Sequence, residues 1–466
     1  MRPKADPPSV FATDSDMLRA VEIEGIEALW SRHLVRRCPL RPNFHSPSMP
    51  PRPARFALLA FAAVSLARAD VPWLPSGLPP APATGLALCP GEFLKPAQGA
   101  AILDAAIAQF PDQARWDTYA AHLRTRIQEA AGLAPWPKRT PLNAVIRDRQ
   151  THDGYTVENV AFESAPGVFV TGNLYRPTGT TGKHPVILST HGHARTVIKP
   201  EDYDTHARFS PTMQTRCANL ARMGAIVFSI DMFAYGEGIQ LYGQAAHRDA
   251  RAITIHVWNG MRALDFLLGL GGADATRVAV SGESGGGTQT FLLAALDPRV
   301  TVSAPVVMVS AHFFGGCPCE SGVPVHRGAD YFANNAMIAA LTAPRPQLLV
   351  SCGKDWTVNT PRVEFPFLQK IYGYYGAADK VANVHLPDED HDYGPSKRAA
   401  VTRFFAAQLG LNLAAVTDAA GQIDESRVTI SRAAALRVFT ADFPVPPHAL
   451  HDAAAIGRAL AALQKP

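Results

Sequence analysis

A serine flanked by glycines is the feature that most constrains this chain. Residues 282–286 read Gly-Glu-Ser-Gly-Gly, after the strand-like run Arg277–Ser281 and before the helix-like run Thr288–Leu293. A buried strand, a sharp turn and a helix are therefore predicted, with the glycines allowing backbone angles that a Cβ would forbid. Such a turn lifts the hydroxyl of Ser284 above the edge of a sheet, where it can act as a nucleophile. The alternative for so short a pattern is a plain glycine-rich turn.

Strand-like and helix-like segments alternate around this turn. The strand-like segments are apolar throughout, which predicts an α/β fold with a mostly parallel central sheet covered by helices on both faces. Active sites in such sheets lie at the carboxyl ends of the strands. The expected strands are 184–190, 225–230, 277–281, 302–309, 346–352 and 381–386, and the expected helices are 211–223, 251–270, 288–296 and 396–409.

Further elements are expected on both sides of this alternation. Apolar residues recur at helical spacing between 97 and 132, which predicts an N-terminal helical segment of two helices packed on the main domain. Residues 156–162 and 168–175 are expected to pair as antiparallel strands around the turn 164–167. The alanine-rich tail beyond Asn412 is expected to be a packing appendage.

The N-terminal region contains a pattern typical of a secretory signal peptide. A basic stretch beginning at Met49 precedes the apolar run 56–66 and an Ala-x-Ala motif ending at Ala69. The alternative is a disordered tail followed by a short core helix. With the signal peptide, the protein is expected to be secreted or periplasmic. The expected divisions are an upstream extension (1–48), the signal peptide (49–69), an N-terminal arm with helices (70–150), the catalytic domain (151–411) and a C-terminal appendage (412–466).

The composition argues against a nucleic-acid-binding protein and against a membrane-anchored one. The chain has 466 residues, 47% of them hydrophobic and 18% charged, and a formal net charge of +4, which argues against nucleic-acid binding. No run of 18 apolar residues is present, so no membrane anchor is expected. The oligomeric state is not set by composition. Among the cysteines, a bridge from Cys317 or Cys319 to Cys352 and buried unpaired thiols are both open.

A serine nucleophile needs a base held by a carboxylate, and two residues fit these roles. Asp355 follows a predicted strand that ends at Cys352, and His391 lies in the loop after the next strand. With Ser284 they give the order Ser, acid, His that α/β-hydrolases use. Glu320 is the alternative acid, while a turn aspartate and a solvated loop histidine are the alternatives for Asp355 and His391.

The oxyanion of an acyl-transfer reaction needs hydrogen-bond donors. The backbone N–H of Gly285, at the start of the expected helix, is one candidate, and that of His193, in the loop His-Gly-His-Ala from 191 to 194, is the other. The two histidines of this loop suggest a metal pair, but the sequence shows no third ligand nearby. The Cys-x-Cys motif likewise lacks a second pair at metal spacing. No metal is therefore expected.

These segments together resemble the secreted bacterial α/β-hydrolases related to acetyl xylan esterases and dienelactone-hydrolase-like enzymes. The resemblance covers roughly Asp153–Leu411 and implies hydrolysis of carboxylic esters, often acetyl or other decorations of plant cell-wall polysaccharide, without a cofactor. The segments that carry it are the 191–193 loop, 231–238, the turn at Ser284, the 353–355 loop and the His391 loop.

Two departures from that family affect the acyl pocket. Acetyl xylan esterases usually carry a tyrosine where His193 stands and a glutamine-type residue where Gly285 stands, so acetyl specificity does not follow from the resemblance. The stretch Ala311–Leu341, with Phe313 and Glu320, is expected to form part of the substrate wall. Trp356 and Tyr235 are candidates to stack on a sugar ring, with simple packing as the alternative.

Two other functions compete with a secreted serine esterase that acts through an acyl-enzyme. A serine peptidase of the prolyl-oligopeptidase kind shares the catalytic domain but carries a large N-terminal propeller. The roughly 110 residues between the expected cleavage site and the parallel sheet are too few to form one. A catalytically inactive polysaccharide-binding protein would not need all of Ser284, Asp355 and His391.

Overall fold

The computed structural model describes residues 73–76, 78, 94–193, 206–322 and 325–465. The predicted upstream extension (1–48) and signal peptide (49–69), and most of the proline-rich stretch after them, lie outside these residues. The described residues contain no helix that is both long and apolar enough to cross a bilayer.

A nine-stranded mixed sheet organises the chain, in the order β1-β2-β3-β5-β4-β6-β7-β8-β9. From β5 to β9 the neighbouring strands pair in parallel, while β1, β2, β3 and β5 pair antiparallel. The predicted α/β-hydrolase fold, with a mostly parallel sheet and an antiparallel pair before it, is confirmed. The strands are β1 (Val145–His152), β2 (Tyr155–Ala165), β3 (Val168–Pro177), β4 (His184–Ser189), β5 (Ile226–Ile230), β6 (Ala273–Glu283), β7 (Val302–Val306), β8 (Gln347–Cys352) and β9 (Val381–Leu386).

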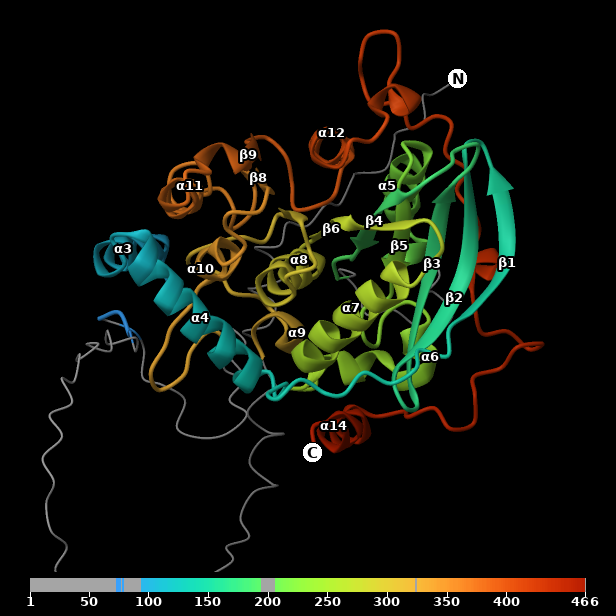
Figure 1. Cartoon of the computed structure of the whole chain (residues 1–466), viewed down its shortest axis with the longest axis horizontal. Coiled ribbons are helices and arrows are strands. Elements are labelled where there is room, and N and C mark those ends of the chain that lie inside the picture. Colours follow the sequence, from blue (N-terminus) through green and yellow to red (C-terminus); the bar gives the residue numbers. More distant parts are fainter. Residues whose placement is uncertain (1–72, 77, 79–93, 194–205, 323–324, 466) are drawn as a thin grey trace, which may run out of the picture. The chain divides into compact units, whose positions relative to one another are not determined.

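Helices cover both faces of the parallel strands, which explains why these strands are apolar on both sides. In Figure 1, α5 and α12 lie on one face, and α7 and α8 lie on the other. The α-helices are α3 (Pro96–Gln109), α4 (Gln113–Ala130), α5 (Pro211–Arg222), α6 (Gly238–Tyr242), α7 (Ala252–Leu268), α8 (Gly285–Leu296), α9 (Pro318–Ser321), α10 (Asn335–Ala340), α11 (Glu364–Tyr374), α12 (Pro395–Leu409), α13 (Ala433–Leu436) and α14 (Ala453–Leu463). Short 3₁₀ helices are η2 (Ala207–Phe209), η3 (Gln244–Arg248), η5 (Ala378–Lys380) and η6 (Leu413–Val416).

The N-terminal helical segment, α3 and α4, is present as expected and packs beside α10 and α11. The side chain of Tyr119 is buried in α4, and its hydroxyl donates to the carbonyl of Phe332 at 2.6 Å. The hydroxyl of Tyr374 in α11 donates to the carbonyl of Phe110 at 2.7 Å. These contacts place the two helices next to the elements that follow β7 and β8.

The C-terminal segment is held by hydrogen bonds to buried side chains of the sheet region. The carboxylate of Glu237 accepts from the amides of Val438 and Phe439, and the guanidinium of Arg208 donates to the carbonyl of Leu436 at 2.7 Å. Asn173 of β3 donates to the same carbonyl at 3.0 Å. The tail is thus anchored through its backbone.

Candidate active site

The glycine-flanked serine lies at the junction between β6 and α8. Ser284 has φ 55° and ψ −123°, a positive φ that is costly for a residue with a Cβ. Its amide donates to the carbonyl of Val306 in the neighbouring strand β7 at 3.0 Å. The turn therefore holds the serine in a strained conformation at the carboxyl end of β6, which is the geometry of a nucleophile elbow.

The two flanking glycines are required by space rather than by backbone angle, which corrects the sequence-based explanation. Neither Gly282 nor Gly286 has a positive φ; Ser284 itself does. A Cβ added at Gly282 would lie 2.1 Å from Oγ1 of Thr190, and one at Gly286 would lie 2.8 Å from the carbonyl oxygen of His191. The glycines thus let the loop after β4 approach the turn.

The structure brings Asp355 and His391 together. Nδ1 of His391 lies 2.7 Å from Oδ2 of Asp355, and the other oxygen, Oδ1, accepts from the amide of Thr357 at 2.6 Å. Burial raises the pKa of the Asp355 carboxyl, but the hydrogen bonds from His391 and Thr357 outweigh it, and the net shift is downward. Asp355 is therefore ionised at neutral pH and can hold the imidazole with its Nδ1 protonated.

The acidic neighbours of His391 are engaged by a buried lysine. Nζ of Lys397, at the start of α12, donates to Glu389 at 2.8 Å, to Asp392 at 2.7 Å and to the carbonyl of Asp390 at 2.9 Å. Lys397 therefore fixes the loop that carries His391, and its single positive charge offsets part of the negative charge of that loop.

Glu320, the alternative acid, lies beside a different histidine. Its Oε1 is 3.6 Å from Nδ1 of His193, and its Oε2 accepts from the amide of Gly316 at 2.9 Å. Burial raises the pKa of the Glu320 carboxyl, and the nearby His193 only partly offsets this. Of the two candidate acids, Asp355 is the one hydrogen-bonded to His391.

The loop after β4 is anchored against the elbow. The amide of Gly192 donates to Oε1 of Glu283 at 2.9 Å, and Oε2 of Glu283 pairs with the buried guanidinium of Arg216 at 2.6 Å. A Cβ added at Gly192 would lie 3.1 Å from Cβ of Ser284. The residue before the nucleophile therefore ties this loop to the serine.

The two predicted oxyanion donors, the amides of Gly285 and His193, directly follow the residues that join the loop after β4 to the elbow. Gly285 is the first residue of α8, so its N–H has no acceptor within the helix. A Cβ added at Gly285 would lie 2.6 Å from Cε1 of His193, so the imidazole of His193 packs directly over the first turn of α8. His191 points elsewhere, because its Nε2 accepts from the amide of Met232 at 3.0 Å.

Comparison with known proteins places this chain in a family. The family model of acetyl xylan esterase (AXE1) matches residues 137–314. The solved structure of the methylesterase BT1017 is 39% identical, covers 80% of this chain and 82% of its own, and superposes with a TM-score of 0.72. The chain belongs to the same family of carboxylic ester hydrolases as this methylesterase. The predicted resemblance and enzyme class are thereby confirmed.

More distant structures include a glucuronoyl esterase from Solibacter usitatus and an acetyl xylan esterase from Paenibacillus sp. R4. The first is 18% identical, with a TM-score of 0.46 over 64% of this chain and 94% of its own. The second is 20% identical, with a TM-score of 0.41 over 61% of this chain and 93% of its own. These similarities are too weak to indicate a substrate. No curated protein sequence matches the chain.

Aromatic residues surround the candidate catalytic histidine of this esterase. Trp356 stacks on Phe313 with ring centroids 3.9 Å apart, and its centroid is 4.4 Å from that of His391. Tyr235 is only 6% exposed and packs against the ring of His247 at 4.6 Å, and burial raises its pKa to about 12. Trp356 therefore lies next to the predicted base and Phe313 lies behind it, while Tyr235 lies beside His247.

The prediction that no further metal ligand lies near the 191–193 loop is wrong. His193 does have further metal-ligating groups beside it: His247, Cys317 and Cys319, with all four ligand atoms within 4.8 Å of one another. His247 was not singled out from the sequence, where it stands 54 residues from His193 with no motif around it. Residue spacing gives no signal for a cluster that only the fold assembles.

The described cysteines of this esterase are unpaired. Cys217, Cys317, Cys319 and Cys352 are all free and buried, so Cys352 forms no bridge to either residue of the Cys-x-Cys motif. Of the two alternatives left open by the sequence, buried thiols are therefore the observed one.

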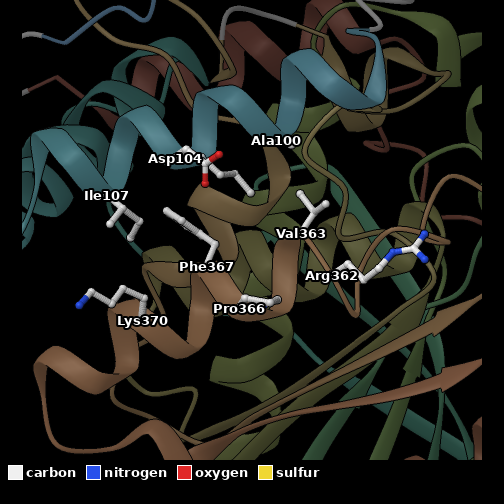
Figure 2. Close-up of a pocket in the computed structure, with 9 residues that line it drawn as sticks. Ala100, Asp104, Ile107, Arg362, Val363, Pro366, Phe367 and Lys370 are labelled. Carbon is white, nitrogen blue, oxygen red and sulfur yellow. The ribbon is translucent and has the colours of Figure 1, made fainter.

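A surface groove lies away from these residues. It runs between α3 and α11 and has a lining that includes Ala100 and Ile107 from the first helix and Phe367 and Lys370 from the second (Figure 2). Its lining contains none of the candidate site residues. The groove is therefore separate from the candidate catalytic residues around the elbow.

Proposed function

We propose that this chain is a serine esterase in which Ser284 is the nucleophile, His391 the base and Asp355 the orienting acid. The observation that carries the proposal is the hydrogen bond from Nδ1 of His391 to Asp355, 2.7 Å long, at the sheet edge where the strained elbow presents Ser284. With Nδ1 protonated and facing Asp355, Nε2 is the nitrogen left to accept the serine proton.

The reaction would proceed in two steps. The Oγ of Ser284 attacks the ester carbonyl as His391 takes its proton, and the resulting imidazolium protonates the leaving alcohol. This leaves an acyl-enzyme. Water, deprotonated by His391, then attacks the acyl carbon, and the proton returns to Ser284 as the acid is released.

The amides of Gly285 and His193 are the proposed oxyanion donors. The amide of Gly285 opens α8, where the positive end of the helix dipole favours a developing negative charge. The fixed contact between Gly192 and Glu283 supports a role for the neighbouring His193 amide, because it holds this loop against the elbow.

The proposed substrates are ester decorations of polysaccharides. The acetyl xylan esterase family model supports an acetyl ester, while the 39% identical methylesterase supports a methyl ester. Because the tyrosine and glutamine-type residues usual in acetyl xylan esterases are replaced by His193 and Gly285, we favour the methyl ester. Secretion to the periplasm or the medium fits such a substrate.

Covalent labelling tests the nucleophile. A fluorophosphonate probe should modify Ser284, located by peptide mass spectrometry, and p-nitrophenyl acetate should be turned over. Both should disappear in Ser284→Ala and persist in Ser426→Ala, which removes an exposed serine of the C-terminal segment. Labelling that persists in Ser284→Ala would refute the assignment.

Product analysis tests the substrate. Methanol release from methyl-esterified polygalacturonate should exceed acetate release from acetylated xylan at equal ester concentration. The reverse order would support the acetyl ester and leave the nucleophile assignment intact.

A further inference from the structure

Four metal-ligating side chains meet beside the elbow, although they come from three separate parts of the chain. His193 follows β4, His247 belongs to η3, and Cys317 and Cys319 lie at the start of α9. Nε2 of His193 lies 2.9 Å from Nε2 of His247 and 3.0 Å from Sγ of Cys319. His247, Cys317 and Cys319 are almost fully buried, and His193 is partly so.

We propose that His193, His247, Cys317 and Cys319 form a Cys₂His₂ site that binds a zinc ion. Two imidazole nitrogens and two thiols are the donor set of many structural zinc sites, which are tetrahedral and fully occupied by protein ligands. The proposal is independent of the reaction assigned to Ser284.

Hydrogen bonding inside the cluster leaves its nitrogens facing one another. Nδ1 of His247 donates to the carbonyl of Phe233 at 2.7 Å, so its Nε2 carries a lone pair. Nδ1 of His193 lies 3.6 Å from Oε1 of Glu320, so the other ring nitrogen, Nε2, is the one directed at His247 and Cys319. In the absence of a cation, a contact of 2.9 Å between these two nitrogens needs a proton between them. One cation between them satisfies both nitrogens and the two sulfurs at once.

The surroundings supply the outer contacts that metal-bound histidines require. Such histidines donate their second N–H to a carbonyl or a carboxylate, which fixes the tautomer and orients the ring. Here the carbonyl of Phe233 accepts from His247, and the carboxyl group of Glu320 lies 3.6 Å from Nδ1 of His193, close enough for charge attraction but too far for a hydrogen bond. Glu320 is itself fixed, because its other oxygen accepts from the amide of Gly316 at 2.9 Å. This gives the otherwise unexplained buried Glu320 a role.

Zinc coordination requires the four side chains to move by up to about 1 Å. Zn–N bonds of about 2.0 Å and Zn–S bonds of about 2.3 Å place tetrahedral ligands roughly 3.3 to 3.8 Å apart. Nε2 of His193 must therefore move away from Nε2 of His247 and Sγ of Cys319 by roughly half an ångström, and ligand atoms near the 4.8 Å limit of the cluster must approach by about 1 Å. The partly exposed His193 is the side chain with room to move. Binding to the neutral cluster releases the two thiol protons, because cysteine binds zinc as thiolate.

A zinc ion here would brace the active site without taking part in the chemistry. All four coordination positions come from the protein, so none is left to activate water. The ion would join η3 and α9 to the loop whose His193 ring covers Gly285. His193 would thus act as a positioning residue for the proposed oxyanion donors, and metal loss should displace them.

Metal analysis of the purified full chain, prepared without a histidine tag, tests the site. We expect about one zinc per chain and an X-ray absorption spectrum of two nitrogen and two sulfur neighbours at the distances of a Cys₂His₂ site. Replacement by Co²⁺ under reducing conditions should give thiolate-to-cobalt charge-transfer bands and the strong d–d bands of a tetrahedral ion. These spectra report ligands directly, whatever the activity.

Two matched variants distinguish zinc bound at this cluster from zinc bound elsewhere on the protein. Cys319→Ser should lose zinc and the cobalt bands, whereas Cys217→Ser, which alters a buried free thiol elsewhere, should keep both. Zinc retained equally in both variants would mean adventitious binding and overturn the proposal. So would wild-type protein that takes up neither metal after reduction, or a chain mass lower by two hydrogens that maps to a Cys317–Cys319 disulfide.

Discussion

The imidazole of His193 occupies the space that a side chain at Gly285 would need. A Cβ added at Gly285 would lie 2.6 Å from Cε1 and 3.0 Å from Nδ1 of His193. The two departures from the usual acetyl xylan esterase pattern are therefore in contact and depend on each other. A glutamine-type residue after the nucleophile cannot be accommodated while this histidine keeps its position.

Gly285→Ala tests this dependence. The added methyl group must push the His193 ring away from α8, so we expect a fall of about 1–3 kcal/mol in the free energy of unfolding. A drop of more than about tenfold in kcat should accompany it, since both proposed oxyanion donors shift. Chemical denaturation and esterase kinetics measure the two effects. The control is Gly373→Ala in α11, where an added Cβ meets nothing within 4 Å.

Asp355→Asn tests the orienting acid. The amide no longer holds the imidazole in the correct tautomer, so kcat should fall by about 10³- to 10⁴-fold, as in other triads. Glu320→Gln should cost far less, because Glu320 faces His193 rather than His391. Measured kcat for both variants on one p-nitrophenyl ester decides between the two acids. Severe loss in the second variant alone would assign the acid role to Glu320.

The central sheet was predictable because its strands are continuously apolar, whereas elements without a clear pattern, among them β1 and α11, were not predicted. The edge strand β1 alternates partly exposed and exposed residues and contains Arg147, Asp148 and Arg149, so its sequence does not indicate a strand. Helix α11 contains Pro366 and Gly373 among aromatic residues and has no side-chain cap. Contacts with neighbouring elements, rather than local propensity, define both.

The candidate site was predictable where chain order carries the information. Ser284, Asp355 and His391 each follow a strand of one sheet, so parallel strands bring them to one edge. The cysteine–histidine cluster has no such signal, because its members are up to 126 residues apart in unrelated loops. The flanking glycines were correctly recognised, but their reason, close contact with the loop after β4, is visible only in three dimensions.

Glu364→Gln should remove a pH dependence of stability. Burial raises the pKa of Glu364 from its ordinary 4.5 to about 7, although one oxygen accepts from the amide of Ala311 at 2.7 Å. As pH rises from 4.5 toward 7, the unfolded chain loses this proton before the folded one does. The free energy of unfolding should therefore fall by about 3 kcal/mol over that range and then level off.

Denaturation with urea at a series of pH values measures the Glu364 effect. In Glu364→Gln the free energy of unfolding should not show this fall between pH 4.5 and 7. The variant should be more stable than the wild type at pH 8, because a neutral amide has no charge to bury. Glu129→Gln, which alters a glutamate with a side chain that is 45% exposed, should follow the wild-type profile. Identical profiles for Glu364→Gln and the wild type would show that Glu364 ionises normally in the folded state.

Arg208→Met should be among the most destabilising single changes. The guanidinium is fully buried, donates to Asp231 at 2.8 Å and also pairs with Glu237, so its removal leaves two buried carboxylates without their cation. A loss of about 3–5 kcal/mol in the free energy of unfolding is expected. Because Glu237 also accepts from the amides of Val438 and Phe439, hydrogen exchange should rise first in the C-terminal segment.

The matched control for Arg208→Met is Arg427→Ala. It breaks an ion pair with Asp153 in which the two side chains are 53% and 52% exposed, so it should lower the free energy of unfolding by less than about 1 kcal/mol. Equal losses in the two variants would mean that the buried network contributes no more than a surface pair.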